Sequence, residues 1–576
     1  MERQLLERYK QELRWLRSRA GLFAAEHPDA AARLGISDDA CSDPHTERLL
    51  ESTALLAAGV QRRIDGACPA VSCGILDAFG LAASPVTPSL VLARMTPTPD
   101  LDPGGFVVPR AAAFQATVAA SSESCILTTC QDMTLRPITI TRSTEHEQDI
   151  ARLSLPIRAR GALKLEFKRI GEATLADLGV EELTLHAIGP AGGAVHAALL
   201  SPNTRLFARS APDPAWVEVS IGLADMTPSI AAGDAHSRSA QDALARECLA
   251  LPERFRGVCI GGLAKVCQHA KGSTLEIVAA FGAPPRDLAI SAPIELALHC
   301  VPLANVYRKR FELRVTSNTN ELWVDKARPD RYDIVAIDEV RTLDEKRSEI
   351  PRFGAAVDGG RAMFMDRRVA RWDGAGERGA SAYHLDFVLA DGSAAHTGSQ
   401  KLSVSALVTD GAVMAASAGR LVIEPAESFP IASIESVSDS SPASAVLTDG
   451  EEAWLRNARA TAQPLADGAT SLAHWFRGLD ATEAANTSLL ARGILGTRVR
   501  PARSVSARGI SHGIEVELQL GAPISNTDGS ATLVGSLLHR AIAWRLSWNA
   551  FIRTVVTLDS EEVARFCSER GHDPVI

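Results

Sequence analysis

Apolar side chains recur at helical spacing near the start of this chain, and this feature most constrains its fold. Steps of mostly three and four residues place one set on a single helix face, comprising Leu5, Leu6, Tyr9, Leu13, Leu16 and Phe23. Asp43 and Pro44 predict the start of a second helix, since aspartate accepts backbone N–H bonds as an N-cap and proline suits the first helical position. The apolar stripe of this second helix comprises Leu49, Leu50, Thr53, Leu56, Val60 and Ile64. Stripes this wide predict that the segment packs against partners.

Length and composition indicate a folded, multidomain protein. The chain has 576 residues, of which 46% are hydrophobic and 22% are charged, and about 150 residues per domain suggests roughly three to four domains. The net charge of −9 offers no overall attraction for nucleic acid or for an anionic membrane surface. Neither a secretory signal pattern nor an apolar run long enough to span a membrane occurs, so we expect a cytoplasmic protein without direct membrane insertion. The 10 cysteines lack the usual zinc-site spacing, which favours reduced thiols.

Changes in composition along the chain predict four domains. A helical segment covers 1–84, where clustered prolines end it, and alternating patterns at 134–140 and 162–167 predict a β-rich domain at 85–242. Strands that follow a helix at 243–255 predict a second β-rich domain at 243–425. The C-terminal domain at 426–576 is expected to be α+β, with helices at 451–459 and 470–479, a strand at 514–520 and a closing helix from about Leu533 to Val556. The expected fold class is therefore multidomain α+β, with a helical N-terminal segment followed by β-rich domains.

One pattern in the chain matches a catalytic motif by letter. Residues 509–513 read GISHG and fit the nucleophile elbow, which needs a strand before the serine and a helix after it. The residues that follow, 514–520, alternate as a strand, so the glycines are expected to shape a loop or a hairpin entry instead. A serine hydrolase that uses Ser511 stays as an alternative.

Other chemistry is sparse in the sequence. The histidines stand apart from one another and no glycine-rich loop has phosphate-binding spacing, so we expect no catalytic residue, no metal site and no cofactor. A β-rich carbohydrate-binding protein is a second alternative. Such proteins usually display aromatic platforms, whereas aromatic residues make up only 5% of this chain.

Several stretches resemble one family along nearly the whole chain. Residues 41–51 read CSDPHTERLLE and are similar to the DPHVERLLE signature of the type VI secretion baseplate subunit family TssF, also called VasA or ImpG. Further similar stretches are QDMTLRP at 131–137, ECLALPERF at 247–255, CVPLANVY at 300–307, LSV at 402–404 with TD at 409–410, and SWNAF at 547–551. The tail from Glu561 and the region 363–372 depart from the family pattern, so those regions are expected to contact their neighbours differently.

The resemblance implies a non-catalytic scaffold in the cytoplasm of a Gram-negative bacterium, docked beneath the inner-membrane complex. In that family, two TssF copies associate with one TssG in a wedge that also carries TssK and TssE. Six wedges surround the VgrG spike and start assembly of the sheath. The implied fold is similar to contractile-phage baseplate wedge proteins, with the N-terminal helices in a bundle shared between subunits.

The apolar stripes agree with such a bundle, because a stripe left exposed would favour aggregation. We therefore expect the first helix to supply partner contacts through Leu5, Leu6, Tyr9, Leu13 and Leu16. Asp43, Pro44, Glu47 and Arg48 are expected to form the capped turn that sets the second helix, and we expect this turn to belong to the same partner interface. The alternative for the first group is that it packs entirely inside the subunit.

Overall fold

The computed structural model of this chain describes two compact units, a helical unit of residues 2–65 and a β-rich unit from residue 87 onward. The predicted helix at 451–459 and the predicted domain limit at residue 84 lie outside the described residues. The description ends at residue 572 and omits 37–41, 66–86, 118–123, 147–149, 212–214, 225, 227, 230–237, 269, 271, 283–293, 316–318, 329–330, 345–346, 354–360, 373–377, 390–392, 394, 396–399, 411–413, 415–420, 444–467, 480–491, 507–508, 522–523 and 525–530.

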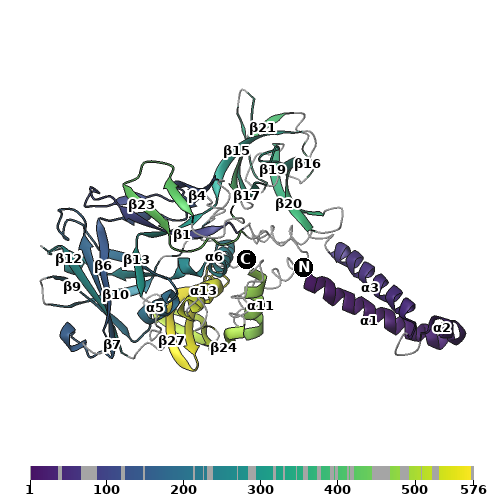
Figure 1. Ribbon diagram of the computed structural model, residues 1–576, viewed down its shortest axis with the longest axis horizontal. Coiled ribbons are helices and arrows are strands. Elements are labelled where there is room, and N and C mark those ends of the chain that lie inside the picture. Colours follow the sequence, from purple (N-terminus) through teal and green to yellow (C-terminus); the bar gives the residue numbers. More distant parts are fainter. Residues whose placement is uncertain are drawn as a thin grey trace. The chain divides into compact units, whose positions relative to one another are not determined.

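The helical unit is a hairpin of two long helices, drawn in purple in Figure 1. Helix α1 spans Glu2–Glu26, the short α2 spans Pro28–Leu34, and α3 spans Pro44–Asp65. α3 packs on α1 through Ala54 and Ala58, both fully buried, because small side chains let two helix backbones approach closely. Gly35 ends α2 in the left-handed conformation, with φ of 65°, where a side chain would crowd the backbone N of Asp43 at 2.9 Å.

A six-stranded sheet forms the first layer of the β-rich unit, in the order β22-β3-β4-β14-β1-β23. Its core includes Met95, Phe114 and Leu127, and the small β2–β5 sheet packs beside it. The bounds are Leu90–Pro97 for β1, Phe106–Val108 for β2, Ala113–Thr117 for β3, Ser124–Thr129 for β4, Met133–Leu135 for β5, Cys300–Ala304 for β14, Val422–Pro425 for β22 and Ile431–Ser436 for β23. Strands from three predicted domains thus share one sheet, and the contiguous ranges 85–242, 243–425 and 426–576 do not coincide with its limits.

An eight-stranded sheet follows, in the order β13-β8-β11-β10-β9-β12-β7-β6. The short helices α5, Gly192–Leu199, and α7, Ala264–Cys267, contribute to its large aliphatic core. The strands are β6 (Ile138–His146), β7 (Gly161–Arg169), β8 (Glu182–Ile188), β9 (Thr204–Ala211), β10 (Val217–Leu223), β11 (Gly257–Gly261), β12 (Thr274–Phe281) and β13 (Glu295–Leu298). The predicted strand at 162–167 is confirmed within β7. The single strand predicted at 134–140 is wrong, because Arg136 and Pro137 separate β5 from β6 and proline cannot donate to a sheet ladder.

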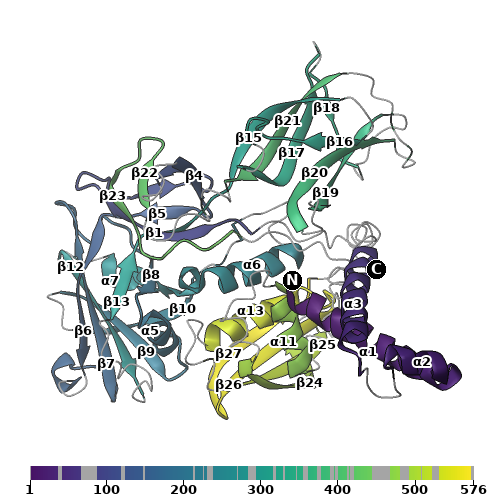
Figure 2. The same ribbon diagram turned by 45° about the vertical axis from the view of Figure 1, so that its right-hand side comes forward.

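Residues 307–409 of the β-rich unit form a β-sandwich (Figure 2). Its four-stranded sheet, β15-β21-β17-β18, and its three-stranded sheet, β16-β20-β19, share one core that includes Val404, Leu385 and Phe387. The strands are β15 (Tyr307–Arg314), β16 (Thr319–Leu322), β17 (Asp333–Thr342), β18 (Glu349–Ile350), β19 (Met363–Trp372), β20 (Arg378–Val388) and β21 (Lys401–Thr409). Alternation of apolar and charged residues along β15 puts one of its faces in this core and the other outside.

The C-terminal sheet, drawn in yellow and green in Figure 2, has the order β24-β25-β26-β27. β25 and β26 are parallel, and the buried helix α13 connects them. α6 and α11 also contribute to its core, through residues such as Leu249 and Trp475. The elements are α6 (Arg238–Ala250), the 3-10 turn η2 (Pro252–Phe255), α11 (Ala469–Leu479), β24 (Ile494–Ser506), β25 (Gly509–Leu520), α13 (Ala531–Ala543), β26 (Ala550–Leu558) and β27 (Glu561–Arg570).

The closing helix predicted from Leu533 to Val556 is wrong in its second half. α13 ends at Ala543, a turn closes with the Ala550 N–H donating to the Ser547 carbonyl at 2.8 Å, and β26 begins. β26 reads AFIRTVVTL, and its β-branched residues favour the strand that their apolar character alone did not reveal. The predicted helix at 470–479 and the predicted strand at 514–520 are confirmed by α11 and β25.

Helix α6 links the layers of the β-rich unit. It packs against α13 of the C-terminal sheet, as Figure 2 shows. The η2 turn that follows α6 contacts both β1 and β8. Across the described residues, no helix is both long enough and apolar enough to cross a membrane.

Candidate functional site

The predicted capped turn begins α3 as expected. Pro44 is the first residue of the helix, and Asp43 accepts the His45 N–H at 3.1 Å through Oδ1 and the Thr46 hydroxyl at 2.8 Å through Oδ2. The hydrogen bonds from Thr46 and His45 favour the ionised carboxylate and so lower the pKa of Asp43. The cap satisfies backbone donors that a helix start otherwise leaves without partners.

Glu47 and Arg48 take different positions in the same turn. Glu47 accepts a hydrogen bond from Arg17 Nε of α1 at 3.1 Å, so it joins α3 to α1, whereas the Arg48 side chain is exposed. The capped turn therefore fixes the register of the helical hairpin. Its predicted role at an interface between subunits stays a prediction.

The predicted contact stripe on α1 is divided between the inside and the outside of the hairpin. Leu13 is 9% exposed, Tyr9 and Leu16 are half-buried, and Leu6 is 49% exposed. The side chain of Leu5 lies outside the described residues. Leu13, and in part Tyr9 and Leu16, are thus covered within the hairpin. For these residues the structure agrees with the alternative that the stripe packs inside the subunit.

A second apolar stripe lies uncovered on α3. Leu49, Leu56 and Val60 are 68%, 72% and 56% exposed, and their spacing places them on the helix face opposite the buried Ala54 and Ala58. We call these three residues the outer stripe. Isolated exposed apolar residues are ordinary, but an aligned row on one helix is typical of a surface that another helix covers.

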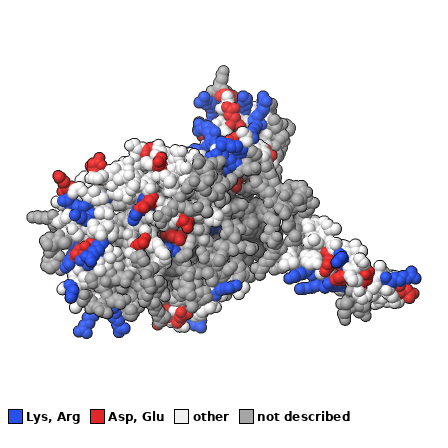
Figure 3. Space-filling model, viewed as in Figure 1, with Lys and Arg blue, Asp and Glu red and all other residues white. Residues whose placement is uncertain are grey.

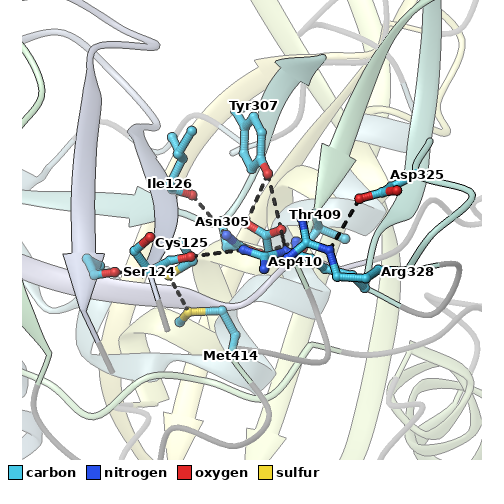
Figure 4. A network of polar contacts seen from close by, with 12 residues as sticks. Ser124, Cys125, Ile126, Asn305, Tyr307, Asp325, Arg328, Thr409, Asp410 and Met414 are labelled. Carbon is cyan, nitrogen blue, oxygen red and sulfur yellow. Dashed lines mark hydrogen bonds and ion pairs between the residues drawn. The ribbon is translucent and has the colours of Figure 1, made fainter. Parts of the chain in front are cut away.

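A buried polar cluster joins the six-stranded sheet to the β-sandwich, and we call it the Asn305 junction (Figure 4). Asn305 is fully buried between β14 and β15. Its side-chain nitrogen donates to the Ile126 carbonyl of β4 at 2.8 Å, and its oxygen accepts both the Thr409 hydroxyl and the Asp410 N–H at 2.7 Å. One amide therefore ties the end of β21 to the neighbouring sheet.

Asp410 extends the junction toward β17. Its carboxylate accepts the Tyr307 hydroxyl at 3.0 Å and lies 3.5 Å from Arg331 Nε, while Arg331 Nη2 donates to the Ser124 carbonyl at 3.1 Å. Burial and the nearby Asp410 carboxylate raise the pKa of Tyr307. Because several buried hydrogen bonds and an ion pair join the same few residues, the junction is a rigid connection between two sheets.

A second buried polar cluster surrounds α6, and we call it the Glu247 junction. Glu247 and Arg254 form an ion pair in which each side chain is 3% exposed. The Glu247 carboxylate also accepts the Ser229 N–H at 2.9 Å. Arg110 donates to the Ser229 carbonyl at 3.3 Å, and its own N–H donates to Asp132 at 2.6 Å. The contacts run without a break from β-strand loops to α6 and η2.

Ser511 lies inside a β-hairpin. It occupies β25 opposite Ser504 of β24, and no helix follows it directly. The adjacent His512 points to the opposite face of the strand, because successive side chains alternate. Of the loop and the hairpin entry that the sequence left open, the structure shows the hairpin, and the strand-turn-helix geometry of a nucleophile elbow is absent there. In the part of the chain that is described, no cluster of three or more His, Cys, Asp or Glu residues has metal-site geometry.

Comparison with known proteins agrees with this architecture and with the resemblance of the sequence. The family model described as "Type VI secretion system, TssF" matches residues 1–573. The chain belongs to the TssF family. Type VI secretion system component TssF1 of Pseudomonas aeruginosa is 29% identical to this TssF-family chain over 360 residues. That alignment covers 59% of this chain and 58% of the relative, so the chain matches little more than half of the relative's length.

Two solved structures share the fold of this TssF-family chain. A chain of the type VI secretion system TssK-TssF-TssG baseplate subcomplex, solved by cryo-electron microscopy, matches with a TM-score of 0.69 and 16% identity, covering 92% of this chain and 99% of that one. A chain of the baseplate complex from the type VI secretion system matches with a TM-score of 0.57 and 15% identity, covering 99% and 100%.

The stretches that carry the TssF resemblance come together at the two junctions. CVPLANVY supplies Asn305 and Tyr307, and the TD pair supplies Thr409 and Asp410, so these two stretches meet in one cluster. In the same way, ECLALPERF supplies Glu247 and Arg254, and QDMTLRP supplies Asp132. Local sequence patterns do not mark these residues as sites. A signal for them was present, because an asparagine at the end of an apolar strand needs buried partners.

Replacing Asn305 with alanine is expected to destabilise the TssF-family chain by about 3 kcal/mol, because the buried Thr409 hydroxyl, the buried Asp410 N–H and the partly buried Ile126 carbonyl lose their common partner. Chemical denaturation of the full chain measures this change. Asn203→Ala is the control, since Asn203 is exposed in the turn before β9. An equal effect of both substitutions would contradict a structural role for the Asn305 junction.

Proposed function

We propose that this chain is a structural wedge component of a bacterial type VI secretion baseplate and that it carries out no chemistry. The observation that carries the proposal is the family match over residues 1–573, supported by the fold shared with a chain of the TssK-TssF-TssG subcomplex. The proposed partners are TssG and TssK, a second copy of this chain, TssE, the VgrG spike and the sheath. Two copies would join one TssG, and six wedges would surround the spike on the cytoplasmic side of the inner-membrane complex.

The proposed mechanism is geometric. The Asn305 and Glu247 junctions hold the sheets together, and buried polar groups that are hydrogen-bonded to one another resist sliding. The β-rich unit would therefore transmit a constant orientation from one contact surface to another. This rigidity suits a protein that sets the angle of its neighbours, and it would give the β-rich unit the role of a contractile-phage wedge protein. Assembly then depends on surfaces that neighbouring subunits cover.

The helical unit is the proposed contribution to a bundle shared between subunits. The outer stripe, with Leu6 of the first helix, supports this role because it presents apolar side chains that the hairpin itself does not cover. Burying each of these leucine or valine side chains contributes about 1.5 to 3 kcal/mol. Asp43 and Glu47 support the same role indirectly, by fixing the position of α3 against α1.

Co-expression with TssG, followed by mass measurement of the purified complex, tests the proposal. We expect a stable assembly of two copies of this chain with one TssG. Substituting aspartate for Leu49, Leu56 and Val60 together is expected to abolish the assembly while the chain stays folded, because these side chains make few contacts within the hairpin. Aspartate at Leu6, Leu13 and Leu16 is a less specific test, since Leu13 is buried inside the hairpin.

Leu343→Asp with Val422→Asp provides a matched control, because both side chains are exposed apolar residues of the β-rich unit. The control variant is expected to form the complex normally. A monomer that ignores TssG, or an outer-stripe variant that assembles as well as the wild type, would refute the proposed bundle. Circular dichroism distinguishes loss of binding from loss of folding.

A further inference from the structure

Strand β15 lies at the edge of the four-stranded sheet of the β-sandwich. Among the described residues only β21 pairs with it, along its whole length from Tyr307 to Arg314. An edge strand of this length presents one row of backbone N–H and C=O groups without ladder partners, and such a row can pair with another extended chain. The apolar residues Phe311 and Leu313 face the sandwich core, so the edge is held firmly in place.

The outward face of β15 is strongly basic. Arg308, Arg310 and Arg314 are exposed, with Glu312 as the one acidic residue among them. On the adjacent strand, Lys401 lies directly opposite Arg314. Lys and Arg side chains gather on this part of the surface around a narrow acidic strip (Figure 3). The concentration of positive charge contrasts with the net charge of −9 of the whole chain.

The charges of this face are only partly balanced within the sheet. Arg308 pairs with Asp338 of β17 at 2.7 Å, and Arg341 pairs with Glu339 on the same strand. Like charges opposite each other, as at Arg314 and Lys401, destabilise a sheet unless an acidic group lies between or above them. A complementary negative partner would therefore relieve repulsion as well as add contacts.

We propose that the free edge of β15 binds an acidic, extended segment of a partner protein, which joins the sheet as an additional strand. Backbone hydrogen bonds would hold the segment, and acidic side chains at alternate positions would meet Arg310 and Arg314, since strand addition takes affinity from the main chain and specificity from alternate side chains. An acidic strand fits better than nucleic acid, because a polypeptide backbone supplies both donors and acceptors for the edge, whereas phosphate groups only accept.

A fluorescent peptide of alternating glutamate and threonine, matched in length to β15, tests the proposal with the full chain. We expect saturable binding that weakens strongly from about 0.05 to about 0.5 M salt. Arg310→Glu with Arg314→Glu is expected to weaken binding by about tenfold or more. Arg142→Glu with Lys168→Glu is the matched control, since it reverses two exposed charges on another edge strand and its neighbour.

A second peptide and a nucleic-acid competitor decide between strand addition and simple charge attraction. A peptide of the same charge that carries a central proline is expected to bind much more weakly, because proline interrupts strand pairing. Equal binding of the proline peptide, equal competition by duplex DNA, or equal binding to both charge-reversed variants would overturn the proposal. Absence of binding at low salt would also overturn it and leave the charges as protection against self-association of the edge. The assay uses the chain alone, so its result is independent of the baseplate role.

Discussion

Replacing Glu247 with alanine is expected to lower the unfolding free energy of the β-rich unit by about 3 to 5 kcal/mol, because the buried guanidinium of Arg254 loses the carboxylate that balances its charge. The same substitution removes the acceptor of the Ser229 N–H. Since α6 and η2 connect β1, β8 and α13, the loss affects the contacts between layers as well as one local pair.

Chemical denaturation of the full chain measures the effect of Glu247→Ala. Glu218→Ala is the matched control, because Glu218 pairs with Arg205 between neighbouring strands but both side chains are about half exposed, at 51% and 49%. That surface substitution is expected to leave stability nearly unchanged, since water and salt screen exposed pairs. If the two substitutions had similar effects, the Glu247 junction would not be what connects the layers of the β-rich unit.

Acid is expected to destabilise the β-rich unit well before most carboxylates are protonated. Burial lowers the pKa of His186 to about 4, that of His196 to about 3 and that of His299 to about 4, from an ordinary value of 6.5. Nearby Arg254, Arg256 and Arg136 lower these pKa values further. The folded chain therefore binds fewer protons than the unfolded chain in this range.

The sign of the pH dependence follows from this difference in proton binding. Stability from the neutral histidines is fully present above the ordinary histidine pKa and is lost as the pH falls from about 6.5 toward 4. Each histidine contributes a slope of about 1.4 kcal/mol per pH unit in this window. Unfolding free energies measured at several pH values between about 5 and 7 isolate the effect, because most carboxylates stay ionised there.

Histidine variants provide the control for the acid prediction. His196→Gln is expected to reduce the slope by the contribution of about one proton. His512→Gln is the control substitution, at an exposed position on β25. A stability that stays flat between about pH 7 and 5 in the wild type would show that the three buried histidines do not control this response.

Local signals predicted the parts of the fold that depend on near neighbours in the chain. The N-cap at Asp43, the proline at the first position of α3, α11 and the strand pattern of β25 all rest on hydrogen bonds or periodicity within a few residues. The hairpin around Ser511 followed from the same periodicity. The error at β26 arose because an apolar run fits a buried helix and a buried strand equally well.

The arrangement of sheets could not be predicted from such signals. β1 pairs with β14 and β23, strands that are far apart in sequence, so the six-stranded sheet draws on three of the expected domains. The Asn305 junction and the Glu247 junction likewise bring together residues from stretches that are far apart in the sequence. Their residues lie in stretches that resemble the TssF family, but only the folded chain shows that these stretches contact one another.

Sequence alone determined the helical start with its cap, the alternation of the strands and the TssF resemblance, because these features depend on residue order over short distances. Tertiary structure decided which apolar side chains of the helical unit are covered and which polar groups share a buried site. Leu13 and Leu56 belong to similar stripes, yet the first is buried and the second is 72% exposed. The reason is physical, since the packing of α3 on α1 selects one face of each helix and periodicity cannot specify which face meets a neighbour.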